Sequence, residues 1–218
     1  MMIKLFHSAV FPILMSTVLT ACGSDIPNQL TGQAVDAQVL NADTKQPIEG
    51  AIVLLTWSSM PKRSIWGFDG SSQGHDICYH AETAVSDAQG RYHTDAWSRM
   101  PPFPKMPNGE FVAIAYKRGY VQTGMAGSLV FRHDDGTPDK RLSPTIFMKH
   151  FTGTLDKRFE DLRTMQQPCH NVEPSAEKNL YPMAKAIYDE MEQTAETKQQ
   201  REVTIPNFKS GLDALPSR

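Results

Sequence analysis

The sequence predicts a mainly β protein, in which an antiparallel β-sandwich is followed by a helical C-terminal extension. The first observation is an apolar run at 51–57, which follows turn residues at 45–50 and is too short for an independent helix. The second is a series of short alternating segments separated by turns. The third is a change in hydrophobic period at Leu155, from about 2 to about 3.6 residues, which is typical of amphipathic helices. We take 51–57 as the central strand of the sandwich.

The first 21 residues have the layout of a secretory signal peptide. Lys4 precedes an apolar stretch at 9–19 that is too short and too interrupted to span a membrane. Directly after it, the sequence 19–23 (Leu-Thr-Ala-Cys-Gly) resembles the lipobox of bacterial lipoproteins, which are cleaved before the cysteine and acylated on it. We therefore expect lipidation, for example with palmitate, of Cys22, and a tether at 22–29. The alternative is an ordinary signal peptide with an incidental cysteine.

Charge and the residue after Cys22 indicate where the mature chain would lie. Loss of 21 residues would leave 197 of the 218, with 21 basic and 24 acidic side chains, because Lys4 is the only charged residue lost. This near balance excludes the basic footprint of a nucleic-acid-binding protein. It also favours attachment through acyl chains over electrostatic docking on anionic lipid. In enteric bacteria, an aspartate directly after the lipidated cysteine favours retention in the inner membrane. This chain has Gly23 at that position, which favours the outer membrane. The protein would face the periplasm or the cell surface.

Alternating segments bounded by turn residues predict the remaining strands. They lie at 30–44, 81–86, 91–94, 110–116 and 145–149, with a further short strand at 128–131. The turn at 87–90 is expected to close a hairpin between the segments on either side of it. In 110–116, either Phe111 or Val112 points inward, because alternation alone does not settle which face is buried.

Two segments interrupt this pattern. The first, 58–79, is rich in Gly, Ser and Asp and carries Trp66, Phe68 and His75. Loops of this length are usually functional or covered, so these three residues form the candidate binding loop. The second, 99–109, holds four prolines and is excluded from a central strand or a helix.

The C-terminal part, 153–218, is expected to be a helical extension of the sandwich. A short helix begins at Leu155 and ends before Pro168. An amphipathic helix follows over roughly 181–200, with Pro182 in its first turn. The tail from Ile205 is expected to be loosely ordered, with the alternative that Phe208, Leu212 and Leu215 pack against the rest of the chain. The apolar face of the second helix is formed by Leu180, Met183, Ala184, Ile187, Tyr188 and Met191.

The three cysteines can be assigned as one lipid acceptor and one pair. If Cys22 carries lipid, Cys78 and Cys169 remain as a pair, and exported proteins meet an oxidising environment. We therefore expect a disulfide between them. Two alternatives stay open: a pair of buried free thiols, or metal ligation together with His80 and His170, although the C-x-x-C spacing of typical zinc sites is missing.

Motifs that carry catalysis are absent from the sequence. It contains no Gly-x-Ser-x-Gly, no His-Glu-x-x-His and no phosphate-binding loop, and its histidines are scattered. We expect no catalytic residues, no metal site and no cofactor.

Landmark residues along 30–123 resemble a known family. The pattern Asp43-Thr44-x-x-Pro47-Ile48-x-Gly50 is followed by Thr83-x-x-x-Asp87-Ala88-x-Gly90-x-Tyr92 and by Gly119-Tyr120. Together they look like the carboxypeptidase regulatory-like (transthyretin-like) domain, less clearly to residue 150. The resemblance implies a seven-stranded prealbumin-like sandwich over 30–152, usually a binding or stabilising module, and lends no catalytic residues. The hydroxyisourate hydrolases share this fold, but their C-terminal Tyr-Arg-Gly-Ser is missing here.

These observations lead to an expected role. It is that of a non-enzymatic outer-membrane lipoprotein whose sandwich is a binding or structural module in the cell envelope, with an envelope protein or a glycan as partner. The alternative is an inhibitor or immunity-type lipoprotein that neutralises a toxin enzyme through the loop at 58–79.

Overall fold

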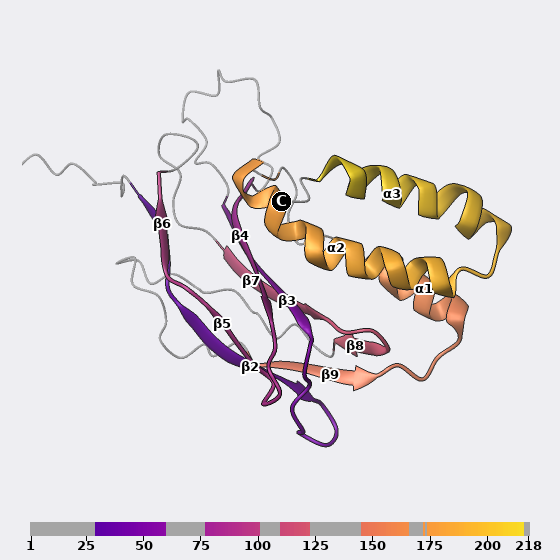
Figure 1. Ribbon diagram of the computed structural model, residues 1–218, viewed down its shortest axis with the longest axis horizontal. Helices are drawn as coiled ribbons and strands as arrows, with labels where there is room; N and C mark the ends of the chain where they lie inside the picture. Colours follow the sequence, from indigo (N-terminus) through magenta and orange to yellow (C-terminus); the bar gives the residue numbers. More distant parts are fainter. Residues whose placement is uncertain are drawn as a thin grey trace, which may run out of the picture.

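The computed structural model describes residues 29–59, 77–100, 110–122, 145–165, 172 and 174–215. Within these ranges the fold is rich in β-structure and carries a helical extension, which confirms the predicted fold class at this level. Figure 1 shows the strands gathered on one side of the molecule and the helices on the other. The four-stranded and the three-stranded sheet pack around one core, and the helices cover the other face of the three-stranded sheet, which gives three layers.

Nine strands are present among the described residues, rather than the seven expected. They are β1 Leu30–Gly32, β2 Val35–Asn41, β3 Ile52–Ser59, β4 Ile77–Val85, β5 Arg91–Thr94, β6 Trp97–Arg99, β7 Glu110–Tyr116, β8 Tyr120–Gln122 and β9 Ile146–His150. One sheet has the order β4-β3-β7, a second has the order β5-β2-β9-β8, and β1 pairs with β6. All pairs are antiparallel except β2 with β9, which is parallel, so the sandwich is mixed rather than purely antiparallel.

The predicted hairpin between 81–86 and 91–94 is wrong. The turn itself forms, because the Gly90 amide donates to the Asp87 carbonyl at 2.8 Å, and Gly90 has a φ of 70°. However, β5 pairs with β2 and not with β4. The turn passes the chain from one sheet to the other, a difference that local turn chemistry does not reveal.

The central strand β3 has both faces buried. Val53, Leu55 and Trp57 point into the sandwich core, where residues of the other sheet such as Val39 and Ile146 meet them. Leu54 points the other way and packs under the helices. The open question in β7 is also resolved, because Phe111 lies in the sandwich core.

The long loop is shorter at both ends than the sequence indicated. Ser58 and Ser59 belong to β3, and 77–79 belong to β4. Arg99 likewise ends β6 rather than opening the proline-rich segment.

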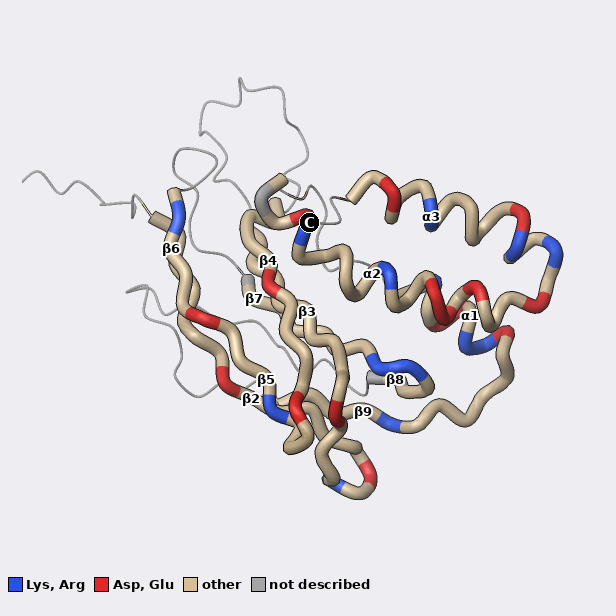
Figure 2. Tube along the Cα trace, viewed as in Figure 1, with Lys and Arg blue, Asp and Glu red and all other residues tan. Residues whose placement is uncertain are grey.

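Three α-helices follow the strands in the described ranges. They are α1 Leu155–Thr164, α2 Pro174–Thr194 and α3 Ile205–Ala214, with a π-helical turn η1 at Gln200–Thr204. At the start of α1, the Thr154 hydroxyl accepts a hydrogen bond from the Lys157 amide at 3.2 Å and caps the helix. Figure 2 shows basic and acidic residues interspersed along the helices, as expected of solvated outer faces.

Helix boundaries depart from the sequence prediction in two places. α2 begins seven residues earlier than predicted, at Pro174, where a missing N–H costs little. Pro182 therefore lies inside the helix and not in its first turn. The tail from Ile205 is helical, because Phe208 and Leu212 bury their side chains against α2 and its surroundings.

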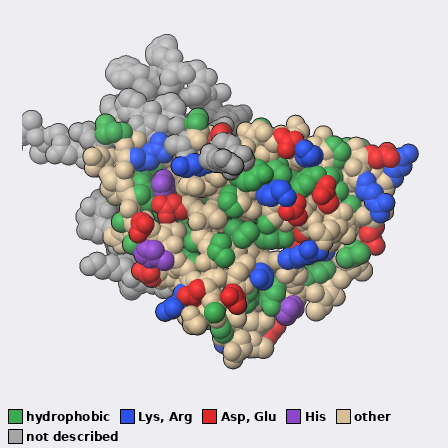
Figure 3. Space-filling view, viewed as in Figure 1, with side chains coloured by type: hydrophobic (Ala, Val, Ile, Leu, Met, Phe, Trp, Pro, Cys, Tyr) green, Lys and Arg blue, Asp and Glu red, His purple; other side chains and the backbone are tan. Residues whose placement is uncertain are grey.

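The predicted apolar face of α2 is confirmed. Leu180, Met183, Ile187 and Met191 are all nearly inaccessible and form a second core with Leu54 and other residues on the helix-facing side of the sheet. Residues at i, i+3, i+4 and i+7 lie on one side of a helix, which is why this stripe meets the sheet. In Figure 3, hydrophobic side chains also reach the surface over α2 and beside it.

A buried ion pair joins α1, α2 and the turn after β7. The Arg158 guanidinium donates to both carboxylate oxygens of Glu190, from Nε at 2.9 Å and from Nη2 at 2.8 Å. Arg158 also donates to the Tyr120 carbonyl at 2.8 Å. The Tyr116 hydroxyl and the Gly119 amide complete the shell around the carboxylate, at 2.8 and 3.3 Å. Every polar atom of the pair is thus engaged, as burial of charge requires.

Candidate functional site

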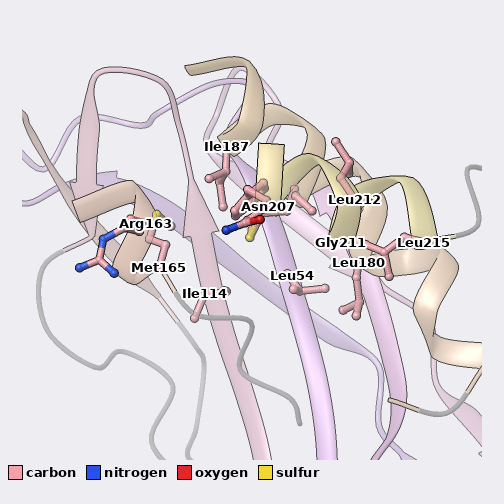
Figure 4. A pocket seen from close by; sticks show the side chains of 13 residues that line it. Leu54, Ile114, Arg163, Met165, Leu180, Ile187, Asn207, Gly211, Leu212 and Leu215 are labelled. Carbon is pink, nitrogen blue, oxygen red and sulfur yellow. The ribbon is translucent and has the colours of Figure 1, made fainter. Parts of the chain in front are cut away.

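An apolar cavity lies between the helix-facing side of the β4-β3-β7 sheet and the three helices (Figure 4). Its volume is about 310 Å³. Its lining comes from β3, β7, the end of α1, α2 and α3: Leu54, Ile114, Arg163, Met165, Leu180, Met183, Ala184, Ile187, Asn207, Phe208, Gly211, Leu212 and Leu215. Only Arg163 and Asn207 among these have polar side chains. Concave sites of this size, apolar inside with few polar groups, are where small ligands usually bind.

The local sequence explains why the cavity has an apolar floor. Leu54 in β3 and Ile114 in β7 are register partners, so their side chains lie next to each other on the same face of the sheet. Helices cover that face of the sheet, so it does not meet solvent. The strands can therefore carry apolar side chains on this face as well as on the face toward the sandwich core. The stripe on α2 that includes Met183 and Ile187 forms the facing wall.

The mouth of the cavity is more polar than its interior. Arg163, Asn207 and Gly211 are all exposed. The Arg163 Nε donates to the Glu160 carboxylate at 2.7 Å, and both side chains of this pair are about half exposed. A methyl group added at Gly211 would meet no atom within 4 Å, so the space beside this glycine is open. The cavity thus has an apolar interior and a cationic side chain at its edge.

A wider groove of about 800 Å³ adjoins the cavity on the side of β8 and β9. The two share Ile114 and Met165 in their linings. The cations of the groove already have partners, since Lys149 lies 2.9 Å from Asp43 and Arg158 is held by Glu190.

A second cluster, of aromatic rings, lies where β3 ends and β4 begins. Trp57 is within 5.3 Å, between ring centroids, of His80, Trp97 and Phe111. His80 stacks on Trp97 at 4.0 Å. Burial lowers the pKa of His80, and the hydrogen bond with Glu82 at 3.0 Å opposes that shift. Trp57 and His80 lie close to the two strand ends that flank the predicted binding loop, and the loop itself lies outside the described residues.

Most of the site residues predicted from sequence lie outside the described residues. These are Cys22, Cys169, Trp66, Phe68 and His75. Cys78 is described and lies fully buried in β4.

The backbone around Cys78 bears on the predicted disulfide. Cys78 forms a parallel bridge with Val172, which follows Cys169 by three residues. The bridge places Val172 beside β4. Cys169 itself lies outside the described residues, and the Cys78–Cys169 disulfide stays a prediction.

In the described part of the chain, no three His, Cys, Asp or Glu side chains gather as a metal site would need. None of the helices in the described ranges combines the length and the apolar character needed to cross a bilayer.

The cavity was missed by sequence reasoning, although a signal for it exists. Phe208, Leu212 and Leu215 lie at helical spacing in the region from Ile205 and form a second apolar helix face. A loosely ordered tail would leave this face without a packing partner. Two apolar helix faces that pack on the same sheet predict a shared core. They do not predict that a cavity remains inside that core.

Comparisons with known proteins give no family. No family model matches the chain, and no curated protein matches it. Among solved structures, a 9R-lipoxygenase from Cyanothece PCC8801 is similar with a TM-score of 0.22 and 14% sequence identity. The alignment covers 91% of this chain and 31% of the lipoxygenase chain, and a likeness this weak carries no argument about fold or activity.

Proposed function

We propose that this chain is a non-enzymatic lipoprotein of the outer membrane, and that its sandwich with the docked helices is a binding module of the cell envelope. The anchor part of the proposal is supported by the lipobox at 19–23, which directly follows the apolar core of the signal sequence. The observation that carries the binding part is the apolar cavity of about 310 Å³ between sheet and helices.

The finer fold in this proposal is the prealbumin-like sandwich of carboxypeptidase regulatory-like domains. Three glycines that mark the resemblance, Gly50, Gly90 and Gly119, all have a positive φ, between 67° and 75°. Such backbone is strained for other residues, so the landmarks coincide with real backbone requirements. The two packed sheets with their core around Val53 also support this architecture.

The anchor is tested by replacing Cys22, which the motif provides as its lipid acceptor. Cys22→Ser is expected to abolish incorporation of labelled palmitate and to leave an unprocessed precursor, because the thiol is the only lipid acceptor that the motif provides. Two or three acyl chains would hold the wild-type protein firmly in the membrane. The readout is palmitate labelling together with fractionation of the envelope. Ser24→Ala, just after the motif, is the matched control and should retain both label and outer-membrane location. Equal labelling of the Cys22→Ser chain would refute the anchor.

The second candidate function, an inhibitor or immunity-type lipoprotein, is favoured by the aromatic cluster at the ends of the predicted binding loop. The packed rings of Trp57, His80 and Trp97 lie near the strand ends that flank this loop. Preorganised loop ends would lower the entropy cost of binding a partner. Co-purification from native membranes, with and without residues 60–76, separates the two candidates. A toxin hydrolase that is lost with the loop supports the inhibitor, whereas an envelope protein or glycan retained without the loop supports the first proposal.

A further inference from the structure

We infer that the cavity between the β4-β3-β7 sheet and the helices binds a single-chain amphiphile with an anionic head, namely a medium-chain fatty acid, with its carboxylate at Arg163. The inference rests on the proposed binding function and gives it a ligand class. The first argument is the lining. Below the mouth it consists of hydrocarbon and thioether side chains, with Leu54 and Met183 each only 2% exposed. A ligand that occupies this interior gains by burial of apolar surface and finds no partner for polar groups.

The size of the cavity also favours a single-chain ligand. A volume of about 310 Å³ lies at the low end of the roughly 300–1,000 Å³ typical of small-molecule pockets. One short alkyl chain fits such a space, whereas the two chains of a phospholipid do not. Met165 caps the end of α1 and Met183 lies in the middle of α2, and both line the cavity. Unbranched methionine side chains adapt readily to a flexible chain.

The third argument is the placement of charge. Arg163 lies at the mouth, and its Nε pairs with Glu160 in a half-exposed contact. Exposed ion pairs of this kind are weak, so a ligand carboxylate can replace Glu160 at little cost and bind the guanidinium in a fork geometry. Asn207, also at the mouth, adds an amide donor. In Figure 4 the Arg163 guanidinium lies at one edge of the lining and points away from its apolar side chains, so a head group bound to it would lie outside the apolar interior that holds the alkyl chain.

The experiment uses the full chain in phospholipid nanodiscs with ¹³C-methyl-labelled methionine, titrated with dodecanoate. Saturable shifts are expected for the methyls of Met165 and Met183, with contacts between the Met183 methyl and the ligand chain. Met148 is the internal control, because it is buried in the sandwich core, away from the cavity. Shifts confined to Met148, or equal at all three methyls, would overturn the inference.

Two variants on the same helix separate cavity binding from partition into the bilayer. Gly211→Phe places a ring in the open space at the mouth and is expected to abolish the Met183 shifts. Ser210→Phe adds the same ring on exposed α3 surface outside the lining and should leave them unchanged. Undiminished dodecanoate binding by Gly211→Phe would overturn the site.

The head group is tested with Arg163→Gln. This variant is expected to weaken dodecanoate binding by about threefold to tenfold, as for a partly exposed charged contact, and to leave binding of dodecanol unchanged. Tighter binding of a lysophospholipid that does not depend on Arg163 would contradict the fatty-acid assignment. A chain that is acylated and located in the outer membrane but shows no methyl shifts would defeat the inference alone and leave the proposed anchor standing.

Discussion

Replacement of Glu190 by alanine is expected to destabilise the fold by about 3–5 kcal/mol. The change leaves the Arg158 guanidinium buried without its counter-charge, because the side chains of the pair are only 3% and 6% exposed. Two of the bonds of Arg158, at 2.9 and 2.8 Å, end on the lost carboxylate, and only the bond to the Tyr120 carbonyl remains. The loss comes mainly from an uncompensated buried charge, and less from the attraction within the pair.

Urea unfolding followed by circular dichroism measures this loss. The double variant Arg158→Met, Glu190→Leu removes both charges and is expected to lose much less than the two single variants together, with a coupling of about 2–3 kcal/mol. The surface pair Lys209–Asp213 on α3 is the matched control, where a single replacement should cost less than about 1 kcal/mol. Single losses below about 1 kcal/mol at Glu190 that simply add to those at Arg158 would refute the packing of α1 and α2 described above.

The same pair sets a pH dependence. Burial alone would raise the pKa of Glu190, but hydrogen bonds from Arg158 and Tyr116 outweigh it and hold this pKa below its usual value of 4.5. Because the folded pKa is depressed, the stabilisation is fully present above about pH 4.5 and is lost as the pH falls through the folded pKa. Glu190→Gln should therefore flatten the acid limb of stability against pH, and an unchanged acid limb would contradict the assignment.

Three further predictions follow from the sheet and its connections. Val53→Ala and Leu54→Ala should each cost about 2–5 kcal/mol in urea unfolding, because the two faces of β3 are buried in different cores; a cost at one site only would mean that one face is open. Gly90→Ala should destabilise the fold, since its methyl group would lie 2.5 Å from a backbone carbonyl and at a φ of 70°, and wild-type stability would refute this geometry. Non-reducing peptide mapping of the exported chain should join Cys78 to Cys169 in one peptide pair, and two alkylatable thiols would exclude the bridge.

The sequence predicted those elements whose signal is local. The buried strand predicted at 51–57 is confirmed as β3, which runs two residues further, and the predicted apolar stripe along α2 is also confirmed. The positions of Gly50 and Gly90 in turns were also expected, and their positive φ explains why glycine stands there.

What the sequence did not predict depends on pairing between distant segments. The turn at 87–90 has the same chemistry whether the chain returns to the same sheet or crosses to the other, so β5 was assigned to the wrong partner. The pairing of Arg158 with Glu190 spans 32 positions and carries no local pattern. The cavity arises from incomplete contact between α3 and the sheet, and this depends on how helix faces meet, which periodicity does not specify.

The central claim is that this chain is held in the outer membrane by lipid and presents the sandwich as a binding module. Intact-mass spectrometry of the protein purified from its native outer membrane tests the claim most directly. The predicted mass is that of a 197-residue chain beginning at Cys22, left from 218 residues by cleavage after position 21, plus the acyl groups on that cysteine. A mass equal to the unmodified polypeptide, or recovery of the protein only in soluble fractions, would contradict the account.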